Sequence, residues 1–226
     1  MTIPEIRAYR MPTSHDLPSN VASWRIQADR AALLVHDLQN FFVDRFPAGQ
    51  EPVTTLLTHV RALCSAARTA GVPVFYSAQP GAMSPRQRGR LVDFWGPGMG
   101  NDPRSRRIVD AVAPLSGDEI VTKWRYSAFH GTDLGTRLAR RGRDQLIICG
   151  VFAHVGCLMT ACDAFSSDLE TFLVTDAVAD FDAAHHWEAL VYAAGRCAVV
   201  LDTARATSQL TPDRESPRAR RAVCVS

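Results

Sequence analysis

The fold is decided by residues 145–167, which read QLIICGVFAHVGCLMTACDAFSS. Residues 145–149 are an apolar run of the length of a buried strand, and residues 157–167 have the length and pattern of a helix. The stretch therefore predicts a strand, a short turn and a helix. The same unit recurs along the chain. Continuously apolar strands that alternate with helices are typical of a parallel sheet with both faces covered.

The repeated alternation predicts an α/β fold, namely a three-layer sandwich around a mostly parallel sheet of roughly six strands. The expected strands are residues 31–35, 72–77, 119–121, 145–149, 171–175 and 198–201. The expected helices are residues 52–70, 133–141, 157–167 and 183–195. Residues 81–103 contain Gly, Pro, Met and Trp without a clear period, and a loop of that length usually closes over a site.

Composition favours one globular domain. The chain has 226 residues, of which 46% are hydrophobic, so residues 1–203 are expected to form one domain with a single core. Residues 204–226 are rich in arginine and poor in apolar side chains, which indicates a disordered tail. The net charge of +2 comes from scattered basic residues and does not indicate a nucleic-acid partner.

Two further features bear on location. The first 20 residues lack a basic start followed by an apolar stretch, and no apolar run approaches the roughly 18 residues of a membrane span. We therefore expect neither export nor contact with a membrane. The six cysteines show no close paired spacing, which predicts free thiols in a reducing, cytoplasmic compartment.

Three residues stand just beyond predicted strands: Asp37, Lys123 and Gly156. Because the carboxyl ends of parallel strands meet at one edge of a sheet, one crevice is expected to collect them. Asp37 supplies an acid and Lys123 a cation, but Gly156 supplies no nucleophile. This combination favours proton transfer over acyl transfer.

The surroundings of Asp37 pull its pKa in two directions. Its neighbours Leu38, Phe41 and Phe42 suggest a partly apolar cavity, and desolvation there would raise the pKa of the carboxyl. The charge of Lys123 would lower it, unless carboxylates of a substrate take up the ammonium group. The alternative for Asp37 is a helix cap. Lys123 lies among alternating cations and aromatic residues, which favours an anion ligand over a solvated surface residue.

The turn over residues 150–157 leads into a helix, where backbone N–H groups favour anions. A Cys at such a helix start can be nucleophilic, although for Cys157 a packed thiol is the favoured interpretation. A group of carboxylates and imidazoles after residue 175 could suggest a metal site. Adjacent histidines point apart, however, so helix capping and surface pairing are favoured, and no metal or cofactor is expected. The group consists of Asp176, Asp180, Asp182, His185 and His186.

Six motifs along residues 4–203 resemble the isochorismatase family. They are HDLQ (36–39), AQPG (78–81), QRG (87–89), DFWGPGM (93–99), KWRYSAF (123–129) and GVFAHVG (150–156). The resemblance is closest to the stand-alone branch that acts on isochorismate or 2-amino-2-deoxyisochorismate in siderophore, phenazine and related pathways. Family members that hydrolyse amides place a Cys where this chain has Gly156, so the glycine indicates the branch that cleaves vinyl ethers.

The resemblance implies roles for individual residues. Asp37 would be the general acid and Lys123 its charged neighbour. Phe152 stands where Tyr is more usual, and the loss of that hydroxyl bears on affinity or substrate choice more than on the reaction. The residues expected to line the substrate pocket are Phe42, Gln79, Arg88, Trp95, Phe152 and Gly156. The resemblance also implies an isochorismatase-like, Rossmann-like fold, a cis peptide between Val151 and Phe152, and a homodimer or higher homo-oligomer.

Two alternatives remain open at this point. One is a Cys-dependent amidohydrolase of the same fold that uses Cys157. The other is a non-catalytic module that docks a carrier protein. The residues also leave open whether the ring of the small-molecule substrate carries a hydroxyl or an amino group.

Overall fold

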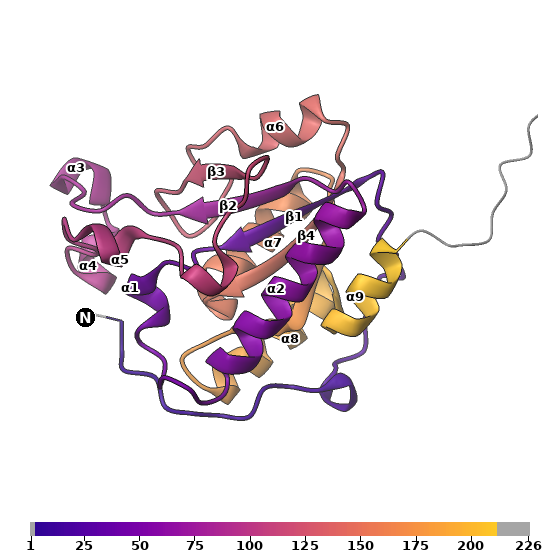
Figure 1. Ribbon diagram of the computed structural model, residues 1–226, viewed down its shortest axis with the longest axis horizontal. Coiled ribbons are helices and arrows are strands. Elements are labelled where there is room, and N and C mark those ends of the chain that lie inside the picture. The colour runs from indigo at the N-terminus through magenta and orange to yellow at the C-terminus, as the bar shows by residue number, and fades with distance from the viewer. Residues whose placement is uncertain (1–2, 212–226) are drawn as a thin grey trace, which may run out of the picture.

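Six parallel strands form one sheet in the computed structural model, which describes residues 3–211 (Figure 1). The order across the sheet is β3-β2-β1-β4-β5-β6, and every neighbouring pair is parallel. The strands are β1 (Ala31–His36), β2 (Val74–Ala78), β3 (Glu119–Thr122), β4 (Gln145–Val151), β5 (Glu170–Ala179) and β6 (Val199–Leu201). The predicted α/β sandwich is confirmed.

Helices cover both faces of the sheet (Figure 1). Helices α2 (Val53–Thr69) and α9 (Thr203–Leu210) pack on one face. Helices α6 (Leu134–Arg140), α7 (Leu158–Ser166) and α8 (Ala183–Arg196) pack on the other. Side chains of a strand alternate between faces, so Leu33 and Val35 enter the core under α2 whereas Ala32 and Leu34 enter the opposite core. Two covered faces explain why β1 is apolar from Ala31 to Val35.

Several short elements lie near the carboxyl edge of the sheet. Helix α1 (Asn40–Val43) follows β1, and α3 (Pro85–Arg88), α4 (Leu91–Trp95) and α5 (Pro103–Arg106) follow β2. A π-type turn spans Ala153–Cys157 after β4, and short turns of 3₁₀ type span Ser14–Asp16 and Asp110–Val112 elsewhere in the chain. Residues 81–103 thus contain two short helices rather than an irregular loop. Ser84 begins α3, because its hydroxyl and the Gln87 side chain cap each other's backbone N–H groups.

The structure corrects the expected start of the tail. Residues 203–210 form α9, which begins where the Asp202 carboxylate accepts a hydrogen bond from the N–H of Arg205. Ala206 and Leu210 are buried, and α9 packs against α2. The prediction failed because two apolar residues, placed one turn apart, suffice for a short helix that covers an existing core. The rest of the predicted tail, residues 212–226, lies outside the described residues.

Strand β5 is longer than expected and extends through residues 176–179. Asp176 therefore lies within the strand rather than after it, and its carboxylate accepts hydrogen bonds from the N–H and hydroxyl of Thr203, both at 2.7 Å. Between residues 3 and 211, no helix combines the length and the apolar character that a bilayer crossing requires.

Candidate active site

The carboxyl ends of four adjacent strands meet at one pocket. Asp37 follows β1, Gln79 follows β2, Lys123 follows β3, and Gly156 lies in the turn after β4. The pocket encloses about 850 Å³ of empty space, its open mouth included. Its lining contains every residue expected from the sequence, namely Asp37, Phe42, Gln79, Arg88, Trp95, Lys123, Phe152 and Gly156. The sheet thus brings together residues that are far apart in the chain.

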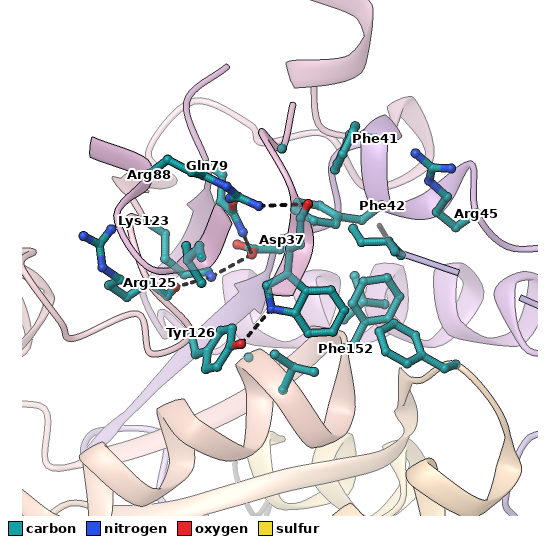
Figure 2. A pocket seen from close by; sticks show the side chains of 18 of the residues that line it. Asp37, Phe41, Phe42, Arg45, Gln79, Arg88, Lys123, Arg125, Tyr126 and Phe152 are labelled. Atoms are coloured by element: carbon teal, nitrogen blue, oxygen red, sulfur yellow. Dashed lines mark hydrogen bonds and ion pairs between the residues drawn. The ribbon is translucent and has the colours of Figure 1, made fainter. Parts of the chain in front are cut away.

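Asp37 is held by three donors, of which Gln79 and Lys123 are drawn in Figure 2. The hydroxyl of Ser77 donates to its Oδ1 atom at 2.5 Å, while Gln79 Nε2 and Lys123 Nζ lie 3.2 and 2.9 Å from its Oδ2 atom. The side chain is not a helix cap, since Gln39 occupies that position before α1. Its backbone has a φ of 50°, a left-handed conformation that few residues other than Gly, Asn and Asp adopt. The strand end therefore aims the carboxylate into the pocket.

The charge balance at Asp37 favours the ionised form. Burial raises the pKa of this carboxyl, but the charge of Lys123 and the hydrogen bond from Ser77 lower it, and the net pKa lies below its ordinary value. The lowering anticipated from Lys123 thus outweighs the raising anticipated from the apolar surroundings. Lys123 itself is only 2% exposed and donates to the carbonyl of Arg125 at 2.6 Å. It is therefore no solvated surface residue.

Arg88 is a buried cation without an acidic partner among the described residues. Its Nε atom donates to the carbonyl of Gly96 at 2.9 Å, and its Nη2 atom lies 3.5 Å from the carbonyl of Trp95. Burial lowers the pKa of this guanidinium. Neutral carbonyls leave its charge uncompensated, so the site suits an anionic ligand. Helices α3 and α4 carry Arg88 and Trp95 to the pocket, as expected of a segment that closes over a site.

Aromatic rings form the opposite wall. Phe152 contacts Phe42 and Phe181, with ring centroids 6.0 and 4.7 Å apart. Trp95 reaches Phe181 from the covering segment, and its indole N–H donates to the Tyr126 hydroxyl at 2.7 Å. The peptide between Val151 and Phe152 is cis, as the resemblance implied. The pocket therefore joins a charged floor to an apolar wall.

Cys157 is fully buried, and burial raises the pKa of its thiol well above the ordinary value. A thiol in that state is protonated and inaccessible, which is the packed role that the sequence favoured.

Within the polar group after residue 175, Asp180, Asp182 and His185 serve as caps and pairs, whereas His186 is fully buried and contacts the Tyr9 hydroxyl and the Thr175 carbonyl. Asp182 begins α8 and accepts a hydrogen bond from the N–H of His185 at 2.9 Å, while Asp180 accepts from His154, with 2.6 Å to its Nδ1 atom. Across residues 3–211, no three or more His, Cys, Asp or Glu side chains cluster as a metal site requires.

Sequence reasoning missed several residues at the pocket. Ser77 ends a predicted strand, so the argument that found Asp37 applies to it as well. Arg125 and Tyr126 belong to the motif around Lys123 and line the pocket beside it. Arg45 also lines the pocket, with its guanidinium 5.4 Å from the ring centroid of Phe41, and no pattern in the sequence pointed to it.

Comparisons with known proteins agree with this geometry. A family model described as the isochorismatase domain matches residues 31–205. The phenazine biosynthesis protein PhzD of Pseudomonas fluorescens is 54% identical over 202 residues, which cover 89% of this chain and 96% of that protein. The isochorismatase of Bacillus subtilis is 50% identical over 210 residues, which cover 93% of this chain and 67% of that protein. The solved structure of a cysteine hydrolase from Pseudomonas syringae pv. phaseolicola is 26% identical and has a TM-score of 0.75. The match covers 85% of this chain and 97% of that one.

Proposed function

The chain belongs to the isochorismatase family, and from this premise we propose that it hydrolyses the enolpyruvyl ether of isochorismate or 2-amino-2-deoxyisochorismate. The products are pyruvate and a trans-2,3-dihydro acid that serves as an aromatic precursor. The carrying observation is the buried pair of Asp37 and Lys123 beside a glycine where a nucleophile would stand. The enzyme is an isochorismatase-type hydrolase, and its place is in phenazine, siderophore or a related biosynthesis.

Asp37 acts as a general acid in this proposal. Its carboxyl transfers a proton to the terminal vinyl carbon, and an oxocarbenium ion forms at the ether carbon. Water adds to that carbon, and the hemiketal collapses to pyruvate and the ring alcohol. The Asp37 carboxylate left behind stabilises the cation, so one side chain serves both steps and no covalent intermediate forms.

Substrate binding prepares the acid. Asp37 is ionised in the free pocket because Lys123 lowers its pKa, so it must gain a proton in the complex. A substrate carboxylate that engages Lys123 compensates this ammonium charge, and the pKa of Asp37 then rises. Arg88 takes a second carboxylate, since no acidic side chain of the described residues neutralises it. The aromatic wall of Phe42, Trp95 and Phe152 holds the ring and its enolpyruvyl arm.

The test is pyruvate release from each substrate, supplied separately. Release that survives Cys157→Ala supports the proposal, because neither step uses a sulfur atom. Loss of activity in Cys157→Ala would instead favour a Cys-dependent hydrolase, and no release from either substrate would contradict the proposed reaction.

We further propose that the enzyme works in the cytoplasm as a homodimer. The free thiols Cys64, Cys149, Cys157, Cys162 and Cys197 support a reducing compartment. The resemblance to dimeric family members supports the assembly, which sedimentation of the purified protein would measure.

A further inference from the structure

His36 occupies the space that a side chain at position 156 would need. A Cβ atom added to Gly156 would overlap the His36 ring, with Cε1 as its nearest atom and both ring nitrogens at 3.0 Å. The backbone of Gly156 is not in the left-handed region, so its conformation alone does not demand glycine. The three atoms nearest to such a Cβ all belong to the His36 ring, so this ring is the first obstacle to a side chain there.

The ring is fixed by hydrogen bonds to both nitrogens. His36 Nδ1 lies 2.9 Å from the carbonyl oxygen of Val151, and Nε2 lies 3.2 Å from the hydroxyl of Thr160. That hydroxyl also accepts from the N–H of Ala128 at 3.0 Å. Burial lowers the pKa of His36 to about 4, so the ring is neutral. Nδ1 then donates to the carbonyl, and Nε2 accepts from Thr160. The ring cannot swing away without leaving buried polar groups unpaired.

We propose that His36 is a positioning residue that keeps position 156 free of a side chain and thereby determines the class of reaction. This inference rests on the proposed function. His36 directly precedes Asp37, so one strand end aims a carboxylate into the pocket and packs an imidazole beneath the turn after β4. A nucleophile at position 156 requires a smaller residue at position 36. The residues at positions 36 and 156 together determine whether the site catalyses proton transfer or covalent attack.

Thermal unfolding tests the packing without any substrate. With His36 present, Gly156→Ala should lower the Tm by about 5 °C because it overpacks a buried site. In a His36→Ala background, Gly156→Ala should leave the Tm unchanged or raise it, since Ala is preferred to Gly in helical backbone. The matched control is Gly195→Ala in α8, where a Cβ meets nothing within 4 Å. Should His36→Ala not fold, His36→Asn keeps a donor for Val151 but lacks Cε1 and Nε2.

Acylation of a thiol at position 156 tests the class of reaction. In the His36→Ala/Gly156→Cys variant, the thiolate should attack the carbonyl carbon of 4-nitrophenyl acetate. An S–C bond forms, and 4-nitrophenolate leaves with the electron pair of the broken C–O bond. We expect a burst of 4-nitrophenolate and one acetyl group on residue 156, located by fragmentation in a mass spectrometer. Gly156→Cys with His36 retained should show neither.

Each outcome bears on a separate claim. Equal Tm losses in both backgrounds would overturn the packing of His36 against Gly156. Two results would overturn the assignment of reaction class even if the Tm changes are coupled. One is a His36→Ala/Gly156→Cys variant that is not acylated. The other is equal acylation of that variant and of Gly156→Cys with His36 retained. A wild-type protein that releases no pyruvate refutes the proposed function but leaves the Tm coupling intact, so the two failures are distinguishable.

Discussion

The Nζ atom of Lys123 lies 2.9 Å from the Oδ2 atom of Asp37, and both side chains are at least 95% buried. Water screens the charges of such a buried pair only weakly. The pKa of Asp37 therefore depends on whether the Lys123 ammonium is paired with Asp37 or with another carboxylate. Lys123 is also the only lysine in the sequence; all the other residues counted as Lys or Arg are arginine. The ammonium group is a compact point charge that can turn from one carboxylate to another, which suits a partner shared between enzyme and substrate.

Replacement of the acid should stop catalysis without removing the pocket. Asp37→Asn should lower the rate of pyruvate release by about 10² to 10⁴-fold or more, because it carries no transferable proton. Asn tolerates the φ of 50° at this position, so the backbone should be retained. Substrate binding, measured by calorimetry, should persist. Asp110→Asn, whose side chain is 84% exposed, is the control. Near-normal turnover by Asp37→Asn would refute the role of the acid.

Removal of the cation should move the pH profile. Lys123→Met removes a charge that lowers the pKa of Asp37, so that pKa should rise in the free enzyme. The acid form is the active one, and kcat/KM therefore falls as the pH rises through this pKa. We expect a lower maximum of kcat/KM and an alkaline limb displaced to higher pH, measured across a pH series. A limb that stays in place or moves to lower pH contradicts the coupling.

Loss of the unpaired guanidinium should weaken binding. Arg88→Ala should raise KM by roughly 10 to 100-fold with a smaller change in kcat, since a charged hydrogen bond held equally in ground and transition states contributes about 1.5–3 kcal/mol. Arg86→Ala, an exposed neighbour on α3, is the control for the folding of that helix. A defect confined to kcat would contradict a binding role for Arg88.

Restoring a hydroxyl to the aromatic wall should alter affinity. Phe152→Tyr adds one potential hydrogen bond to substrate, which should lower KM by about 5-fold for a net contribution of about 1 kcal/mol. kcat should change little, because the group does not transfer the proton. The ratio of KM values for isochorismate and its amino analogue should be measured in both proteins. A large loss of kcat would show instead that the wall cannot accommodate the added atom.

Buried neutral histidines should make the protein sensitive to acid. Burial lowers the pKa of His36 and His186 from 6.5 to about 4. The unfolded chain therefore binds more protons between these values, and the free energy of unfolding falls as the pH drops from 6.5 to 4, by about 3 kcal/mol for each histidine. Urea unfolding at several pH values measures this slope. His186→Gln should flatten it by about half, whereas the exposed His15→Gln should not change it.

The core strands were accessible from the sequence, although the ends of β4 and β5 were placed too early, since residues buried on both faces are mostly apolar regardless of their partners. Strands β1 and β3 were located to within one residue for this reason, and Asp37 followed from β1 and Lys123 from β3. Helix α9 was missed because its Ala206 and Leu210 depend on a core built by other elements. The packing of the His36 ring against Gly156 was also inaccessible, because no local pattern joins a strand end to a distant turn.

Asp37, Gln79 and Lys123 directly follow three strands that are neighbours in the sheet. The spacing between their side chains is therefore set by main-chain pairing between these strands. The segment that carries Arg88 and Trp95 has no such constraint. Related enzymes can accordingly exchange that covering segment and acquire new substrates while the distances among the reacting groups stay constant.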